Sequence, residues 1–351
     1  MTVSQQTAAR SADGAPGAAA AAAADLAEPT PEKKRASRLS FAIKLGITFA
    51  VTAYVLWQAG LVDALQTLAG ADFRLVALAA ISAVVAMVIN VKRWQVMLQG
   101  QGNEAALGTL IRLYLVAMFF NNILPSRFAG DVVRAYGTSV RLTTKTRSAA
   151  AVIMDRLVGA ISVLLLGVIA MVFSPSVIPW QLSQLLVVGL IAGLAVVGLL
   201  VVPSPLQGTM RHLLGLGGKL PLIGKFLGKR LNAAVDAVLA YSGKPGLIVW
   251  ALLVSMIANG LSIVNIYLYA LAVGADVSLA KAAVVVPVVL AVGLLPISLN
   301  GLGVIEGTFV VLLGLMGVPP DMALAVALLR RLVLLGQSLV GGVLYSTRRF
   351  G

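Results

Sequence analysis

The chain has 351 residues, of which 59% are hydrophobic and only 11% carry a charge. A soluble domain carries about 25% charged residues, so this chain has too little polar surface for a water-soluble particle and is predicted to be an integral membrane protein. Soluble enzyme folds and nucleic-acid-binding proteins are thereby excluded, and the net charge of +14 is expected to come from basic cytoplasmic loops that face anionic lipid. Because the sequence has no cysteine and only one histidine, we expect no disulfide, no metal site and no cofactor.

Residues 1–40 are rich in alanine, proline, serine and charge, and are predicted to form a disordered tail. A signal peptide is the alternative, but acidic residues flank the alanine run 18–24 on both sides, unlike a typical signal sequence. Basic residues between Lys33 and Lys44 precede the first apolar run and should hold the N-terminus in the cytoplasm. Residues 41–351 are expected to form a single transmembrane domain.

Nine apolar runs follow, at Leu45–Leu61, Leu75–Val91, Leu113–Leu124, Leu157–Phe173, Leu185–Val202, Leu247–Leu271, Ala282–Leu299, Val304–Val318 and Met322–Tyr345. A crossing helix requires about 20 apolar residues, and six of these runs can supply one once their helical ends are added. The third, seventh and eighth runs are anomalous. The third is short and ends in Leu124-Pro125, the seventh contains Pro287 and Pro296, and the eighth is short and carries Glu306.

The basic residues predict the orientation of these segments. With a cytoplasmic start and six crossings, the inside loops are 92–147, 203–246 and 346–351, and the outside loops are 62–74, 174–184 and 272–281. The outside loops carry only Arg74 and Lys281 as basic residues. Full crossing by the third run would place the basic stretch 127–147 outside, so this run is expected to enter from the cytoplasm and turn back. The loop 203–246 is predicted to lie on the cytoplasmic leaflet as an amphipathic helix.

Two parts of the chain share an order of features. Each has an apolar run broken at Leu-Pro, a glycine-containing turn, a short helix and then a long helix with adjacent charges, Asp155-Arg156 in one and Arg330-Arg331 in the other. The halves cover about 45–173 and 185–345, and three crossings in each would make the second half inverted relative to the first. Broken segments at corresponding positions of inverted halves point to a transporter's central site. The predicted fold is therefore an all-α polytopic membrane protein with about six transmembrane helices and two re-entrant hairpins in an inverted repeat.

Charged residues inside the apolar runs are candidates for function. Arg330 and Arg331 lie well inside the last run, where each charge costs about 2.5–3.5 kcal/mol on insertion scales, and Glu306 and Asp155 are their candidate partners. The arginines could hold a lipid phosphate, for which a guanidinium group is suited, or form a salt bridge that only fixes the packing.

Further candidates surround the two breaks. Arg127 and Arg134 could guide an anionic headgroup with Asp131 orienting one of them, or the three could form a solvated cap. Asparagines near the breaks could bind a headgroup or satisfy backbone freed by the prolines. The candidate substrate-binding set is Asn121, Asn122, Arg127, Asp131, Arg134, Asp155, Arg156, Asn300, Glu306, Arg330 and Arg331, and the candidate hairpin-breaking set is Pro125, Gly130, Pro296, Gly301 and Gly303.

The glycines after the second break have a packing interpretation. Gly301-Leu302-Gly303 does not extend to the G-x-G-x-x-G pattern, because position 306 is Glu and no strand precedes it, so a nucleotide site is not expected. Gly303 and Gly307 form a G-x-x-x-G pair, which is typical of a close helix-packing face. The helix N-terminus after the turn could alternatively attract an anion.

The string Asn122-x-x-Pro125, Gly130-Asp131-x-x-Arg134 and Asp155-Arg156 resembles the transmembrane region of lysylphosphatidylglycerol synthases and the wider group of flippase-like membrane proteins. The later Leu295-Pro296 with Asn300-Gly301-Leu302-Gly303-x-x-Glu306 is similar to that family's second signature, and the resemblance covers about residues 41–345. It implies movement of a lipid, such as aminoacylated phosphatidylglycerol, between leaflets. The soluble domain that performs aminoacyl transfer in full synthases is not expected here.

The leading hypothesis is therefore a non-enzymatic, flippase-like translocator in the bacterial cytoplasmic (inner) membrane, with both termini cytoplasmic. Its expected partners are membrane lipids, anionic or aminoacylated, with a homo-oligomer or a lipid-modifying enzyme as further partners and no nucleic acid. Two alternatives stay open. One is a membrane enzyme that uses Asp131, Asp155 and Glu306 for acid–base chemistry on lipid-linked substrates. The other is a scaffold for lipid or polysaccharide assembly.

Overall fold

The computed structural model describes residues 31–124, 129–141, 144–173, 184, 240–241, 243–294 and 297–347. The chain divides into two compact units, Met1–Gly46 and Ile47–Gly351, and the features discussed below belong to the second unit. All of the elements in the described ranges are helices, which confirms the all-α prediction for that part of the chain.

Five described helices are long and apolar enough to cross a membrane: α3 (Pro31–Ala59, with its apolar part at Phe41–Ala59), α5 (Phe73–Gly100), α8 (Lys145–Phe173), α12 (Pro245–Ala272) and α15 (Pro320–Ser346). They account for five of the six predicted crossings. The other, Leu185–Val202, lies outside the described residues, as do residues 1–30 of the predicted tail. Helix α3 begins at Pro31, within the last ten residues of the range 1–40 that was predicted to be a tail.

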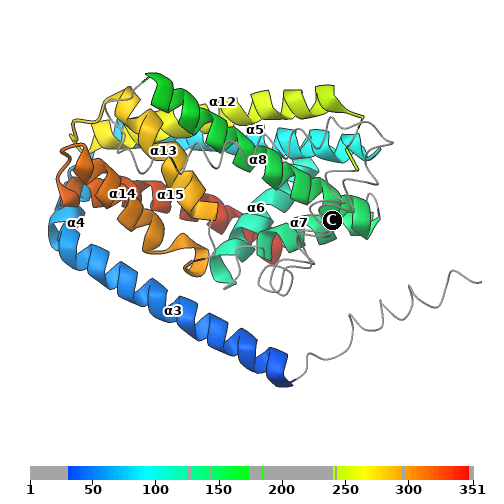
Figure 1. The fold of residues 1–351 in the computed structure, drawn as a ribbon, viewed down its shortest axis with the longest axis horizontal. Coiled ribbons are helices and arrows are strands. Elements are labelled where there is room, and N and C mark those ends of the chain that lie inside the picture. The colour runs from blue at the N-terminus through cyan, green and yellow to red at the C-terminus, as the bar shows by residue number, and fades with distance from the viewer. Residues whose placement is uncertain are drawn as a thin grey trace, which may run out of the picture. The chain divides into compact units, whose positions relative to one another are not determined.

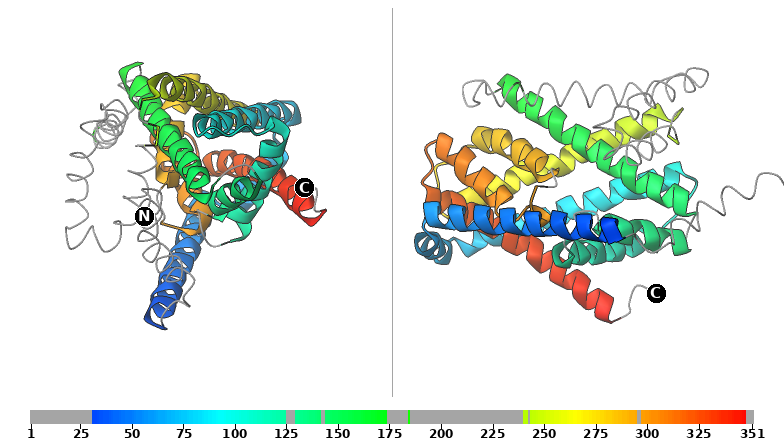
Figure 2. Two further views of the ribbon diagram at one scale, coloured as in Figure 1. Left: turned by 90° about the vertical axis from the view of Figure 1, so that its right-hand side faces the viewer. Right: turned by 60° about the horizontal axis from the view of Figure 1, so that its bottom comes forward.

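Helices α5 and α12 form an antiparallel pair (Figures 1 and 2). Helix α5 starts after Asp72, whose side chain accepts a hydrogen bond from the backbone N–H of Arg74 at 2.8 Å and so caps the first turn. Near this end, the N–H of Asp72 donates to the carbonyl of Ala272 at 2.9 Å, where α12 finishes. A 28-residue helix is about 42 Å long, so the two ends of this pair lie on opposite sides of a bilayer.

Contacts near the ends of the helices define these two ends. At the first end, Thr67 donates to Asp321 at 3.3 Å and the Lys281 ammonium donates to the carbonyl of Met316 at 3.2 Å. At the other end, the hydroxyl of Tyr241 donates to the carbonyl of Met97 at 2.6 Å. The segments 62–74 and 272–281, which were predicted to lie on the same side of the membrane, are therefore close together. At the other end of the pair, the last residues of the segment 203–246 contact the last turns of α5.

The first interrupted hairpin consists of α6 (Leu107–Ile123) and α7 (Ala129–Arg141). It starts near the Gly100 end of α5, where the carbonyl of Ala105 accepts from Gln95 at 2.7 Å, and α7 returns toward the start of α8. Gly130 allows a close approach, because a Cβ there would lie 2.5 Å from the carbonyl oxygen of Ala117. The structure therefore confirms a helix pair that turns back at the predicted break.

The second interrupted hairpin consists of α13 (Leu279–Leu294), the 3-10 turn η3 (Leu299–Gly301) and α14 (Val304–Leu315). It begins and ends at the opposite end of the α5–α12 pair, beside Lys281 and Met316. The tips of the two hairpins meet, since the Asn300 amide donates to the Asn122 side-chain carbonyl at 2.5 Å. The hairpins thus enter the bundle from opposite ends, while the inverted repeat itself stays a prediction.

Small residues bring these helices into contact. A Cβ on Gly341 of α15 would overlap the carbonyl of Leu115 in α6. A Cβ on Gly303, whose φ is +75°, would lie 2.5 Å from the hydroxyl of Thr52 in α3, and one on Gly307 would lie 3.0 Å from Val55. The Gly303–Gly307 pair is therefore a helix-packing face. The short helix α4 (Leu61–Ala69) links α3 to α5 and contacts α15.

Candidate functional site

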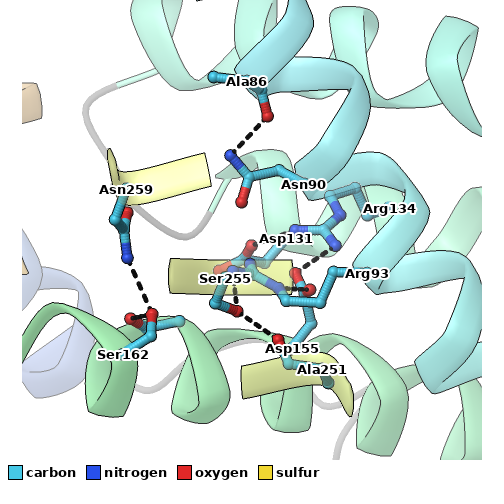
Figure 3. A network of polar contacts seen from close by, with 11 residues as sticks. Ala86, Asn90, Arg93, Asp131, Arg134, Asp155, Ser162, Ala251, Ser255 and Asn259 are labelled. Atoms are coloured by element: carbon cyan, nitrogen blue, oxygen red, sulfur yellow. Dashed lines mark hydrogen bonds and ion pairs between the residues drawn. The ribbon is translucent and has the colours of Figure 1, made fainter. Parts of the chain in front are cut away.

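A polar cleft of about 310 Å³, which we call the main cleft, opens among helices that are otherwise apolar. Its charged lining residues come from three helices: Arg93 from α5, Asp131 and Arg134 from α7, and Asp155 and Arg156 from α8. Figure 3 shows how most of these side chains converge. Four of the five were predicted from the sequence as substrate-binding residues.

Asp155 is the centre of this cluster. Its side chain is only 2% exposed, and each carboxylate oxygen accepts a hydrogen bond from a different guanidinium group (Figure 3). Arg93 Nε donates to Oδ1 and Arg134 Nη2 donates to Oδ2, both at 2.7 Å. The prediction that Asp155 partners Arg330 or Arg331 is therefore wrong, because the packing of α5 and α7 against α8 provides two closer arginines.

Arg134 is held by aromatic rings as well as by carboxylates. Its guanidinium carbon lies 4.2 Å from the centroid of the Trp94 ring and 5.2 Å from that of Tyr114. Asp131 on the preceding turn lies 3.8 Å away, and Arg134 Nε has no hydrogen-bond partner among the described residues. A guanidinium group between aromatic faces keeps its orientation while one nitrogen stays available to a ligand.

Asp131 and Arg156 join the first hairpin to the long helix that follows it. Arg156 Nε lies 2.5 Å from Asp131 Oδ2, and both side chains line the main cleft. Asp131 was predicted to orient Arg127 or Arg134, and its shorter ion pair in the structure is with Arg156, while Arg134 lies 3.8 Å away.

Arg93 is not among the predicted site residues, because the apolar run ends at Val91 and so predicts a loop from residue 92 onward. Helix α5 continues to Gly100, so Arg93 lies inside the bundle, where Nη1 donates to the hydroxyl of Ser255 at 2.9 Å (Figure 3). A Cβ on Gly159 would lie 3.2 Å from the same nitrogen, so a glycine there leaves room for the guanidinium group. The apolar residues Met97 and Leu98, a helical turn further on, were the available signal that α5 extends beyond Val91.

Neutral polar side chains complete the main cleft. Asn90 donates to the carbonyl of Ala86 at 3.0 Å, and Asn259 donates to the hydroxyl of Ser162 at 2.8 Å (Figure 3). Both asparagines line the cleft and neither was among the predicted site residues. Single amides in apolar helices carry too weak a signal to be separated from residues that only bond to their own backbone.

The second hairpin has its own ion pair. Arg331 donates to Glu306 Oε1 through Nη2 at 2.5 Å and through Nε at 2.8 Å, as the predicted partnership of Glu306 requires. Glu306 Oε2 accepts the N–H of Gly303 at 2.8 Å, so the same carboxylate also caps α14. Asp131 and Arg156 stand 25 positions apart, and so do Glu306 and Arg331.

The asparagines near the breaks bond to protein groups. Asn121 Oδ1 accepts the N–H of Gly130 at 2.7 Å and so ties α6 to α7, which favours the backbone-satisfying alternative for this residue. Asn122 and Asn300 bond to each other, and Asn300 has the left-handed φ of +49°. Gly301 is buried in the same turn with φ of +72°. The predicted residues Pro125, Arg127 and Pro296 lie outside the described residues, and Arg330 lines a separate chamber considered below.

Within the described ranges, no group of three or more His, Asp or Glu side chains is arranged to hold a metal ion. The charged groups instead form pairs with an excess of arginine. Three arginines and two aspartates line the main cleft, so its full ionisation leaves one net positive charge.

Comparison with known proteins identifies the family of the chain. The sequence profile of the family described as "Lysylphosphatidylglycerol synthase TM region" matches residues 41–341. A "UPF0104 membrane protein" from Methanothermobacter thermautotrophicus is 26% identical over 259 residues, which cover 69% of this chain and 75% of that protein. The chain is therefore a multi-pass membrane protein that belongs to the lysylphosphatidylglycerol synthase transmembrane-region family.

Proposed function

We propose that this protein moves a lipid with an anionic headgroup between the two leaflets of the membrane. The observation that carries the proposal is the main cleft, a polar space of about 310 Å³ with three arginines inside a bundle of apolar helices. The headgroup would pass through this space while the acyl chains stay in the surrounding lipid.

The charge of the main cleft favours an anion. Placing each charged group at membrane depth costs about 2.5–3.5 kcal/mol on insertion scales, so such residues are retained for pairing or for function. Asp131 and Asp155 neutralise two of the three arginines. A phosphate monoanion would neutralise the third, and guanidinium groups bind phosphate oxygens with good geometry.

The meeting point of the two hairpins would act as the gate. Asn122 and Asn300 join the tips through one neutral hydrogen bond, whose net contribution is about 1 kcal/mol. In this proposal a headgroup that moves from one end of the bundle to the other passes between the hairpin tips, and a bond of that strength opens readily. Since the sequence has no ATP-binding motif, the movement would be passive or coupled to an ion.

We place the protein in the cytoplasmic membrane with both termini and the segments 101–147 and 203–246 on the cytoplasmic side, because the segments predicted to lie outside carry only Arg74 and Lys281 as basic residues. The first hairpin would then open to the cytoplasm and the second to the outside. An enzyme is the weaker alternative, since Asp131, Asp155 and Glu306 are each bound to a guanidinium group, which favours binding over proton transfer.

The decisive experiment is a lipid-translocation assay in vesicles that contain the purified protein and a fluorescent lipid whose outer-leaflet fraction can be quenched chemically. Faster equilibration than in protein-free vesicles is expected for at least one anionic, aminoacylated or polyprenyl-phosphate lipid. Unchanged rates for all three classes would refute the proposal.

The gate can be tested by cross-linking, because the sequence has no cysteine. A short thiol cross-link in the pair Asn122→Cys/Asn300→Cys should stop translocation, and a reductant should restore it. The matched control is Thr67→Cys/Asp321→Cys, which links side chains that lie 3.3 Å apart at one end of the bundle. Translocation that continues in the cross-linked tip variant would exclude this route.

A further inference from the structure

A second polar chamber, of about 180 Å³, lies beside the main cleft. We call it the Arg330 chamber, and its polar lining includes Asn265 from α12 and Arg330 and Gln337 from α15. Asn90, Tyr114, Met118 and Leu290 line both spaces, so the chamber and the main cleft are contiguous.

Two amide side chains in this chamber each have one polar atom without a hydrogen-bond partner among the described residues. Asn265 Oδ1 and Gln337 Nε2 are buried and form no hydrogen bond within the described part of the chain, and the two residues are only 8% and 9% exposed. At least about 90% of buried polar groups in proteins are hydrogen-bonded, because an unpaired buried group costs about 1–3 kcal/mol. One unpaired acceptor and one unpaired donor in the same chamber point to a ligand that offers both kinds of group.

The chamber also has an unbalanced charge. Glu306 gives Oε1 to Arg331 and Oε2 to the backbone N–H of Gly303. Arg330 forms no hydrogen bond or ion pair with any residue that the structure describes, although its side chain lines the chamber. Glu306 and Arg331 neutralise each other and do not line the chamber, so the positive charge of Arg330 is left for an anionic oxygen to neutralise.

We infer that the Arg330 chamber binds a phosphodiester whose small headgroup carries a hydroxyl or a primary ammonium group. Arg330 and Gln337 Nε2 would donate to the phosphate oxygens, and Asn265 Oδ1 would accept from the headgroup donor. A quaternary ammonium headgroup has no N–H or O–H to donate and would leave Asn265 unpaired. The volume of about 180 Å³ is below the usual 300–1,000 Å³ of ligand pockets, which favours a small headgroup over a lipid-linked oligosaccharide.

This inference rests on the proposed function, because that function makes a membrane lipid the source of the ligand. It is tested by measuring ligand binding instead of translocation. Short-chain phosphatidylglycerol, phosphatidylethanolamine and phosphatidylcholine are titrated into the purified full chain in non-ionic detergent. Glycerophosphoglycerol, the same phosphodiester without acyl chains, forms a fourth arm. The glycerol and ethanolamine lipids should bind at least about tenfold more tightly than the choline lipid. Weaker binding of glycerophosphoglycerol identifies a lipid as the source, and equal binding identifies a soluble ester of the same chemistry.

The variants assign this preference to named groups. Arg330→Gln should weaken phosphatidylglycerol binding at least about tenfold, because it removes a charged donor to the phosphate. Gln337→Met should weaken the binding about fivefold, because the donor it removes is neutral and forms a weaker hydrogen bond. Asn265→Leu should reduce the preference for phosphatidylglycerol over phosphatidylcholine to about twofold or less. The control is Gln95→Met, since Gln95 Nε2 already donates to the carbonyl of Ala105 at 2.7 Å. Gln95→Met should lower thermal stability and keep the affinity, whereas Gln337→Met should keep the stability of the lipid-free protein and lose affinity.

The inference is overturned if Gln337→Met and Asn265→Leu bind all three lipids as the unmodified protein does, because the chamber would then hold only water. Comparison with the vesicle assay separates the two proposals. Binding with this preference but without translocation refutes the proposed function alone. Translocation whose headgroup preference is unchanged in the chamber variants refutes the chamber inference alone.

Discussion

Replacing Asp155 by Asn tests whether the main cleft depends on a shared buried carboxylate. The substitution keeps the size of the side chain but removes the charge that Arg93 and Arg134 both contact at 2.7 Å. Two buried guanidinium groups then lose their counter-charge, and the amide places an N–H donor opposite one of them. Removing one partner of a buried ion pair costs about 3–5 kcal/mol.

The expected shift in melting temperature follows from the size of the chain. Unfolding entropy is about 2.1 cal/mol/K per residue, which gives about 0.7 kcal/mol/K for 351 residues. A loss of about 3–5 kcal/mol therefore lowers Tm by about 4–7 °C, measured by intrinsic fluorescence in detergent. The control Asp276→Asn changes an exposed carboxylate and should shift Tm by less than about 1 °C.

A triple variant separates loss of pairing from loss of packing. Arg93→Met/Arg134→Met/Asp155→Leu removes every charge of the triad and keeps side chains of similar size. Replacing buried ion pairs by apolar groups is commonly neutral or stabilising, so the triple variant should recover most of the Tm lost by Asp155→Asn. An unchanged Tm in Asp155→Asn, or a triple variant at least as unstable as the single one, would refute the reasoning.

Three further outcomes are expected. Gly341→Ala should lower stability by about 1–3 kcal/mol, because the new Cβ overlaps the backbone of α6, whereas Gly336→Ala has open space and should be neutral or stabilising, as measured by thermal unfolding. Tyr241→Phe should cost about 1 kcal/mol at pH 7. Burial raises the pKa of the Tyr241 phenol in the folded protein. As the pH passes about 10, the phenol therefore ionises only in the unfolded chain, and the stability that Tyr241 contributes is lost as the pH rises further. In unfolding series between about pH 8 and pH 11, the difference in unfolding free energy between the unmodified protein and Tyr241→Phe should narrow. In intact cells an impermeant maleimide should label Asp276→Cys and spare Lys145→Cys, and the reverse pattern would invert the proposed orientation.

The sequence was informative where charge interrupts an apolar pattern. Asp155 and Glu306 stood out because a carboxylate in a membrane helix requires a partner, and Asp131 stood out because it follows the first break; each has an arginine partner in the structure. The choice of partner could not be predicted. It depends on which helices pack together, and Asp155 contacts arginines from α5 and α7 rather than those of the last helix.

Arg93, Asn265 and Gln337 were not predicted, for two different reasons. Arg93 was assigned to a loop because the apolar run ends before α5 does, and the helix continues through a basic segment. Asn265 and Gln337 are neutral, so nothing in the pattern separates them from amides that bond locally. Their significance appears only when helices far apart in the sequence enclose one chamber.

The separation of bonded residues along the chain has a consequence for how this protein is made. The ion pairs Asp131–Arg156 and Glu306–Arg331 each close within 25 positions, so each hairpin can neutralise its charges as soon as the next helix leaves the ribosome. The contacts of Arg93 reach 62 positions to Asp155 and 162 positions to Ser255. The main cleft is therefore completed only after α12 has been inserted, and during earlier synthesis Arg93 must be held by the translocation machinery, by water or by lipid headgroups.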